Sequence, residues 1–240
     1  MHLQILYKDQ YLVAINKPHD LLVHQSAIAR DAKEFALQIL RDQLGQWVSP
    51  VHRLDRKTAG VLLFALDKNT EKLMNQQFAE GLIKKKYLAI VRGYTNDQQD
   101  IDYPLKKENG TLQTAFTSFR TLSRTEIAIP FGKNETSRYS LVEASPTTGR
   151  MHQLRKHFAH IHHPIIGDRP HGCNKQNKLF KEKWGMDTMM LHASELCFTH
   201  PITHEMINFK ADISEEFLRV LSFLKFDMKE CCENMTSHKN

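Results

Sequence analysis

One segment of the 240-residue chain combines an acid with several bases in a pattern that could do chemistry. It reads Val-His-Arg-Leu-Asp-Arg-Lys-Thr-Ala-Gly-Val-Leu-Leu over residues 51–63. Asp55 lies between Arg53 and Arg56, and a neighbouring or distant cation would keep its carboxylate ionised and oriented. A carboxylate held in this way can act as a nucleophile or as a general base. The alternative is a structural ion pair at the entrance to the buried strand predicted over residues 60–66.

Other catalytic patterns are missing from the sequence. The order His-Arg-Leu-Asp at residues 52–55 differs from the His-Arg-Asp order of the protein kinase catalytic loop. The ten glycines include no Gly-x-Gly pair, and no Asp-Phe-Gly triplet occurs, so a kinase is excluded. Histidines cluster over residues 157–163, but neither His-Glu-x-x-His nor Cys-x-x-Cys accompanies them. We therefore interpret this cluster, including His157, as a basic and partly solvated face, and we expect no metal site.

The positive charge of the chain is concentrated in one segment. The sequence has 33 Lys and Arg against 27 Asp and Glu, which gives a formal net charge of +6. Residues 150–183 hold eight of these bases and two of the acids, so they account for the whole excess. A focused positive field of this kind suits a polyanionic partner such as a nucleic acid. The alternative is a solvated basic face that has no partner.

Composition indicates the class of protein. Apolar residues make up 41% of the chain and charged residues 25%, which is typical of a globular protein with a core and excludes a disordered chain. The longest uncharged apolar run, residues 60–66, is far shorter than the ~18 residues that span a bilayer. The N-terminus has no secretory leader, and the four cysteines lack Cys-x-x-Cys spacing. We therefore expect a cytoplasmic protein without a membrane partner.

The elements expected around these residues favour an α+β fold, with a mixed, largely antiparallel sheet flanked by helices. Helical spacing of apolar residues predicts helices over 31–44, 69–82, 151–162 and 214–224. We expect Asp31 and Asn69 to cap the first two of these helices and Gly45 to end the first. Apolar runs bounded by turn residues predict strands over 3–7, 11–16, 60–66, 86–92, 116–129, 139–144 and 190–198. We expect residues 1–226 to form one domain and residues 227–240 to form a polar, disordered tail.

The segment around Asp55 resembles the motif that surrounds the nucleophilic aspartate of the RluA-type pseudouridine synthases. Other segments resemble further motifs of this family in the same order: Asn-Lys-Pro at 16–18, Lys-Lys-Tyr-Leu-Ala at 85–89, Thr-Gly-Arg-Met-His-Gln-Leu-Arg-Lys-His at 148–157, His-Pro-Ile-Ile-Gly-Asp at 163–168 and Leu-His-Ala at 191–193. The resemblance covers residues 3–225. Ala59 departs from the serine that is usual at its position, which removes a hydroxyl but no proposed catalytic group.

The resemblance implies roles for individual residues. Asp55 would attack the target nucleoside, at the ribose or at the uracil ring, and Arg155 would pair with Asp55. Tyr87 would stack against the base and accept the sugar proton. Arg53 would enter the space left by the flipped uridine. The remaining substrate-binding residues would be His52, Arg56, Lys86, Arg150 and His152. The reaction requires no metal and no cofactor, so neither is expected.

The compact layout, without an additional N-terminal RNA-binding domain, is most similar to the family members that modify uridine 65 of tRNA. We therefore expect a monomer that isomerises a uridine of tRNA, with an RNA surface over residues 84–86 and 150–183 and substrate choice in residues 96–113 and 130–137. Three alternatives are left: the same reaction on ribosomal RNA, a non-catalytic RNA-binding module, and a metal-dependent nuclease. The joint presence of the predicted nucleophile, tyrosine and arginine favours the enzyme.

Overall fold

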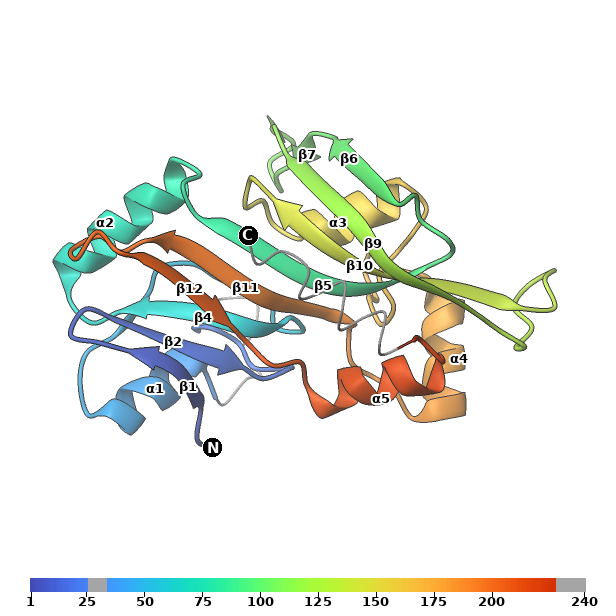
Figure 1. Cartoon of the computed structure of the whole chain (residues 1–240), viewed down its shortest axis with the longest axis horizontal. Coiled ribbons are helices and arrows are strands. Elements are labelled where there is room, and N and C mark those ends of the chain that lie inside the picture. The colour runs from blue at the N-terminus through green and yellow to red at the C-terminus, as the bar shows by residue number, and fades with distance from the viewer. Residues whose placement is uncertain (26–33, 228–240) are drawn as a thin grey trace. The chain divides into compact units, whose positions relative to one another are not determined.

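The computed structural model describes residues 1–25 and 34–227, which form two compact units (Figure 1). Unit 1 consists of residues 1–86 and 192–213, and unit 2 consists of residues 87–191 and the chain from residue 214 onward. Within the described ranges, no helix has the length and hydropathy needed to cross a bilayer. The organisation of residues 1–226 as one domain stays a prediction, and the expected tail lies outside the described residues except for Asp227.

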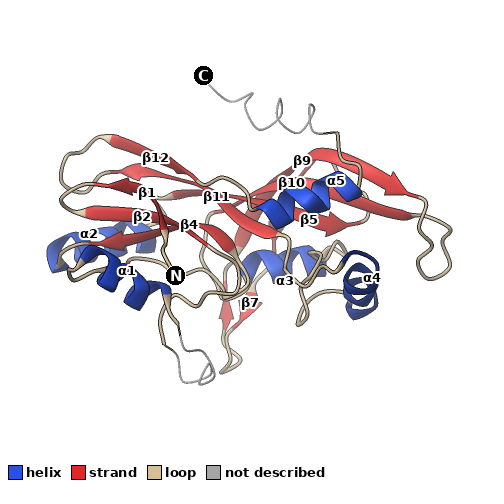
Figure 2. Cartoon of the chain, turned by 90° about the horizontal axis from the view of Figure 1, so that it is seen from below, coloured by secondary structure: helices blue, strands red, loops and turns tan. Residues whose placement is uncertain are grey.

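Unit 1 is a mixed sheet with two helices. Its strands have the order β1–β2–β4–β11, with β12 beside β11 and β3 beside β4. The bounds are Gln4–Lys8 for β1, Leu12–Lys17 for β2, Ser49–Pro50 for β3, Ala59–Ala65 for β4, Leu191–Thr199 for β11 and Met206–Lys210 for β12. Strands β4 and β11 are parallel, and the other pairs are antiparallel. Helices α1 (Ala36–Leu44) and α2 (Lys68–Ala79) lie on the same side of these strands (Figure 2).

Strand β4 is the centre of unit 1, and all seven of its residues are buried. A continuous apolar run without alternation is typical of a strand that is covered on both faces, as the sequence predicts here. Leu63 of β4 packs in one cluster with Met74 of α2 and Phe198 of β11. This packing leaves the preceding polar turn, which contains Asp55, at the entrance to a fully apolar strand.

Helix α1 begins later than the sequence indicates, at Ala36, and helix α2 begins one residue earlier, at Lys68. Helix α2 is capped by Asp67, whose carboxylate accepts a hydrogen bond from the Thr70 N–H at 2.9 Å. The expected cap, Asn69, therefore lies inside the helix. Helix α1 follows Phe35, which has an extended backbone and makes no capping bond through its side chain. The expected cap of α1, Asp31, lies outside the described residues.

Unit 2 is an antiparallel sheet covered by helices. Its strands have the order β5–β10–β9–β6, and β7 pairs with β8 in a separate ribbon. The strands are β5 (Lys84–Arg92), β6 (Gln98–Asp102), β7 (Leu105–Lys106), β8 (Leu112–Gln113), β9 (Phe116–Ile127) and β10 (Ser137–Pro146). The helices are α3 (Gln153–His160), α4 (Asn174–Trp184) and α5 (Glu215–Phe223). The α+β class with a mixed, largely antiparallel sheet is confirmed, and Figure 1 shows how far the β9–β10 hairpin extends.

Unit 2 differs from the expectations in helix α3, strand β6, helix α4 and the short β7–β8 ribbon, which the sequence did not predict. Helix α3 begins at Gln153 rather than at residue 151, because His152 has a left-handed backbone with φ of 56° and cannot continue a helix. Strand β6 and helix α4 have no counterpart among the predicted elements. Only one residue of β6 and two of α4 are buried, so their apolar periodicity is too weak to indicate an element.

The close parallel pairing of β4 and β11 requires glycine at position 60. Gly60 has a φ of +110°, and a Cβ atom there would lie 2.1 Å from the Ala193 carbonyl oxygen. We expect Gly60→Ala to lower the free energy of unfolding by about 3 kcal/mol or more, because strain and a backbone clash coincide. Gly45→Ala is the matched control: Gly45 has a φ of +63° but open space around it, and we expect a loss of about 1 kcal/mol. Equal losses in urea denaturation would contradict this account.

Candidate active site

Asp55 lies in the turn that leads into β4. The Thr58 N–H donates to the Asp55 carbonyl oxygen at 3.0 Å, which closes a four-residue turn with Arg56 and Lys57 at its centre. Leu54 and Thr58 on either side are buried, whereas the Asp55 side chain is half-buried. The turn therefore has a fixed backbone and a carboxylate that solvent can reach.

The basic residues of this turn differ in their surroundings. Arg56 forms an ion pair with Asp20, in which Nε lies 3.1 Å from Oδ1, and Lys57 lies 3.9 Å from the same carboxylate oxygen. Arg53 is exposed. An exposed arginine beside the turn is suited to contact RNA, and the substrate-binding roles of Arg53 and Arg56 stay predictions.

His52 is held inside unit 1 by two contacts. Its Nε2 atom accepts a hydrogen bond from the Leu63 N–H at 3.0 Å, and its ring stacks on Phe78 with 5.0 Å between ring centroids. Burial, followed by the positive charge of Lys85, lowers the pKa of His52 to about 3. The imidazole is therefore neutral at physiological pH, so His52 links the turn to β4 and brings no positive charge to the predicted RNA contact.

A buried lysine at the end of β2 holds the backbone of the Asp55 turn by a hydrogen bond to the Arg56 carbonyl oxygen. Lys17 is fully buried, and its Nζ atom donates to the carbonyl oxygens of Pro18 at 2.8 Å, Leu21 at 2.9 Å and Arg56 at 3.1 Å. Burial lowers the pKa of Lys17 to about 7, while the negative charges of Asp55 and Asp20 act in the opposite direction. Sequence reasoning missed this role. The available signal was a lysine directly before a proline, at the end of a strand that is apolar from Leu12 to Ile15.

Arg155 of α3 forms a buried, two-pronged ion pair in unit 2. Its Nε and Nη2 atoms donate to the two carboxylate oxygens of Asp168, each at 2.8 Å. The side chains are 8% and 1% exposed, respectively. Asp168 is held in turn because its carboxylate accepts from the His171 N–H and its carbonyl oxygen accepts from the Asn177 amide. No role was predicted for Asp168 from the sequence, although Asp168 is the last residue of the His-Pro-Ile-Ile-Gly-Asp segment at 163–168, which resembles a motif of the family.

Gln153 fixes the loop that precedes α3. Its Oε1 atom accepts from the Thr148 hydroxyl at 2.6 Å and from the Arg150 N–H at 3.0 Å. Its Nε2 atom donates to the Phe116 carbonyl oxygen and to the Thr117 hydroxyl. All four hydrogen-bonding positions of this buried amide are therefore used. The backbone beside Arg150 is rigid as a result, and the Arg150 side chain donates from Nε to the Thr114 carbonyl oxygen.

Two histidines of this region have different environments. His152, a predicted substrate-binding residue, is half-buried, and its Nδ1 atom lies 2.9 Å from Nε2 of His171. His157 is fully buried, with Nδ1 on the Thr117 hydroxyl and Nε2 on the Tyr103 carbonyl oxygen, both at 3.0 Å. Burial lowers the pKa of His157. The interpretation of His157 as part of a solvated basic face was therefore wrong, because both ring nitrogens serve the interior.

The remaining predicted site residues lie on β5. Tyr87 pairs in register with Ala144 and packs, half-buried, against the core cluster that contains Ala89 and Phe158. Lys86 lies at the end of unit 1, where its Nζ atom is 3.6 Å from the Glu195 carboxylate. The predicted catalytic residues thus belong to both units: the aspartate to unit 1, and the tyrosine and the arginine of α3 to unit 2.

The buried ammonium of Lys17 predicts a pH dependence of stability. Its pKa in the folded protein is about 7, below the ordinary 10.5, so the unfolded chain binds more protons between these values. The wild type should therefore gain stability relative to Lys17→Met as the pH rises from about 7 towards 10. Thermal unfolding of both proteins across this range measures the effect. If the Tm of the wild type minus that of Lys17→Met stays constant or falls as the pH rises, the assignment is contradicted.

The buried ion pair of unit 2 predicts a large mutational effect. We expect Asp168→Asn to lower the free energy of unfolding by about 3–5 kcal/mol, because it leaves the buried guanidinium of Arg155 without its counter-charge. Glu216→Gln is the matched control, since it removes the acid of the solvent-exposed Arg219 pair and should cost less than about 1 kcal/mol. Similar losses for the two variants in urea denaturation would argue against the buried pair.

Comparison with known proteins identifies the family. Residues 11–160 match the family model described as RNA pseudouridylate synthase. The chain is 45% identical to tRNA pseudouridine synthase C of Vibrio cholerae, over 92% of this chain and 95% of that protein. It is 44% identical to tRNA pseudouridine synthase C of Pasteurella multocida, over 95% and 98% of the two chains.

A solved structure has the same fold. Human RNA pseudouridylate synthase domain containing 4 superposes with a TM-score of 0.73 over 94% of each chain, at 24% sequence identity. At this identity the likeness concerns the fold alone, and the sequence matches carry the assignment. The chain belongs to the RNA pseudouridylate synthase family.

Proposed function

We propose that this protein isomerises a uridine of tRNA to pseudouridine, and that the uridine is at position 65. The observation that carries the proposal is the match, at 42–46% identity over about nine-tenths or more of the chain, to several proteins named tRNA pseudouridine synthase C. The chain also spans nearly the whole length of these relatives. We place the enzyme in the cytoplasm, acting as a monomer. No particular observation favours ribosomal RNA or a non-catalytic role.

Asp55 is the proposed nucleophile. Isomerisation must break the bond between the sugar and a ring nitrogen and then join the sugar to a ring carbon, so a group that attacks the ribose or the ring is required. The Asp55 carboxylate is half-buried in a turn whose backbone is held by Thr58 and by the ammonium of Lys17. A rigid support lowers the entropy lost when an attacking group is brought to its target.

Arg155 is proposed to pair with the Asp55 carboxylate during the reaction, and Tyr87 to stack on the base and accept the sugar proton. A guanidinium has five N–H donors in one plane, so the two bonds from Arg155 to Asp168 do not use all of them. Because Asp168 fixes the plane of this guanidinium, the direction of its other donors is also fixed. Arg155 is thus suited to bind a second carboxylate in one defined orientation.

The target uridine must leave its stacked position before Asp55 can reach it. Extraction of a base costs a few kcal/mol of stacking and pairing, which a side chain that enters the gap can offset in part. Arg53 is the proposed residue for this task because it is exposed next to the nucleophile. His52, Arg56, Lys86, Arg150 and His152 are proposed to contact the RNA around the extracted nucleotide.

Asp55→Asn tests the nucleophile. The amide has nearly the same shape but cannot attack, so we expect pseudouridine formation in a tRNA transcript to fall at least about 10³-fold while the fold and RNA binding persist. Asp20→Asn is the control, because it removes a neighbouring carboxylate at an exposed position whose φ of 65° asparagine tolerates. Normal turnover by Asp55→Asn would overturn the assignment.

The position is tested in cells. Mapping of pseudouridine in total tRNA and ribosomal RNA, with and without the gene, should show loss at tRNA position 65 alone. Loss of a ribosomal site with all tRNA sites unchanged would overturn the tRNA substrate.

A further inference from the structure

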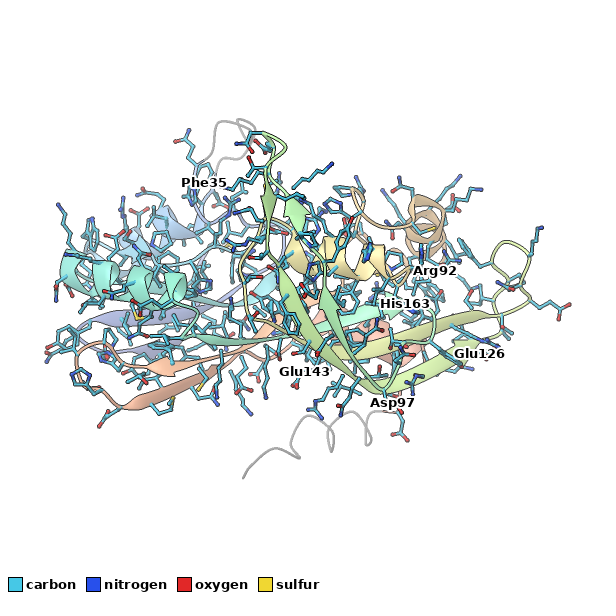
Figure 3. The ribbon with its side chains drawn as sticks, turned by 90° about the horizontal axis from the view of Figure 1, so that it is seen from above. Phe35, Arg92, Asp97, Glu126, Glu143 and His163 are labelled. Atoms are coloured by element: carbon cyan, nitrogen blue, oxygen red, sulfur yellow. The ribbon has the colours of Figure 1, made fainter. Side chains whose placement is uncertain are left out.

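The backbone at the end of β5 is held rigidly next to His163. The Arg92 N–H donates to the Pro164 carbonyl oxygen at 3.0 Å, and the Arg92 carbonyl oxygen lies 2.8 Å from Nδ1 of His163. Gly93 follows with a φ of +83°, and a Cβ atom there would lie 3.1 Å from the same imidazole nitrogen. Figure 3 shows Arg92 and His163 in this part of unit 2, close to α4. The base of the Arg92 side chain therefore has a fixed position.

The guanidiniums of Arg92, Arg138 and Arg219 in unit 2 each lie over an aromatic ring, and Arg92 differs from the other two because no described carboxylate pairs with it. The Arg92 guanidinium lies over the ring of Phe131, with Cζ 5.0 Å from the ring centroid, which orients its plane. The other arginines of this unit that make ion pairs are Arg120 with Glu143, Arg124 with Asp97, Arg138 with Glu126, Arg155 with Asp168 and Arg219 with Glu216. Within residues 1–25 and 34–227, no carboxylate lies within ion-pair distance of Arg92. Its positive charge is thus stacked but not neutralised.

Arg92 and Phe131 line a cavity of about 230 Å³ whose other walls are polar. These walls include Asn134 and Ser137 of the β9–β10 hairpin and Gln176 of α4. In the described part of the chain, no acidic residue lines this cavity. Two residues that line the cavity contact an acid outside it: Arg138 forms an ion pair with Glu126, and the hydroxyl of Thr136 donates to the same carboxylate. The cavity is thus lined by two arginines and by neutral hydrogen-bonding groups, and of the two arginines only Arg138 is paired with a described carboxylate. This is the chemistry of an anion site.

We propose that this cavity binds a backbone phosphate of the RNA substrate, in addition to the contacts made around the catalytic residues. This inference rests on the proposed function for the identity of the RNA. A guanidinium that is already stacked on an aromatic ring loses little freedom when it binds a phosphate with its N–H edge. The exposed side-chain amide of Asn134 then supplies a neutral donor for a further phosphate oxygen, beside Gln176, whose Nε2 atom already donates to the Tyr139 hydroxyl.

Helix α4 favours a polyanion over a small anion. The helix that contributes Gln176 also carries exposed Lys175, Lys178, Lys181 and Lys183, and its single acid is Glu182. A strip of positive charge beside one phosphate site suits a chain of phosphates, because each neutralised phosphate releases counterions. Arg92 thereby extends the basic segment 150–183, although it lies far from that segment in the sequence.

Salt-dependent binding of the tRNA transcript tests the site. We expect Arg92→Gln to weaken binding on the order of tenfold at about 0.1 M salt and to reduce the slope of log K against log salt by about one. Arg219→Gln is the matched control, since it removes the same charge from unit 2 at an exposed ion pair, and its slope should equal that of the wild type. Equal affinities and slopes for the two variants would overturn the proposal.

Two further variants separate charge from stacking and from folding. Arg92→Lys keeps the charge, so the salt slope should be retained while affinity falls. Phe131→Leu removes the ring and keeps an apolar side chain, so affinity should fall with an unchanged slope. A slope of log K against log salt that is smaller than the wild-type slope in Phe131→Leu would contradict a phosphate contact made by a stacked arginine. The same result in Arg92→Lys, with the native circular dichroism spectrum retained, would also contradict it.

The source of the phosphate and the proposed function are tested separately. Inorganic phosphate should compete with tRNA only weakly. If binding of inorganic phosphate depends on Arg92 but binding of tRNA does not, the proposal that the cavity binds an RNA phosphate is overturned. Pseudouridine formation by the wild type is measured on the same transcript. If tRNA binding depends on Arg92 but no pseudouridine forms, the phosphate site stands and the proposed function fails.

Discussion

A polar group that is removed from water must find partners inside the protein, and this requirement determines how the candidate segments are held. Lys17 satisfies its ammonium on three carbonyl oxygens, one of which belongs to the Asp55 turn. Gln153 satisfies its amide on the loop before α3. Asp168 satisfies both carboxylate oxygens on Arg155. Because moving any of these segments would leave a buried polar group unpaired, each is more rigid than an ordinary surface loop.

The need of buried polar groups for partners also determines which basic side chains are available at the surface. Burial lowers the pKa of both His52 and His157, and both imidazole rings make hydrogen bonds inside the protein. Arg155 is neutralised by Asp168. The positive charge of segment 150–183 that faces solvent is therefore shared between the four lysines of α4, where Glu182 offsets one of them, and Arg150, Lys156 and Arg169.

The parts of the fold that could be predicted are those with a strong local signal. Strand β4 is a continuous apolar run, and Gly45 ends α1 with a left-handed backbone, as expected. The candidate residues could be found because the motif residues are contiguous in the sequence. The interactions that support them could not, because they join distant segments: Asp168 with Arg155, and Phe131 with Arg92. A left-handed His152 or a buried His157 likewise depends on neighbours that one sequence does not reveal.

The Asp168 pair explains why an arginine suits position 155 better than a lysine. The ammonium of a lysine is a point charge, and a buried carboxylate beside it would become its main partner. A guanidinium can bind one carboxylate along one edge and keep donors on another. The buried pair of Arg155 and Asp168 is neutral as a whole, so it places no net charge in the interior of unit 2. In the proposed mechanism, Arg155 would stabilise the Asp55 carboxylate by directed hydrogen bonds, whose geometry Asp168 sets, more than by net positive charge.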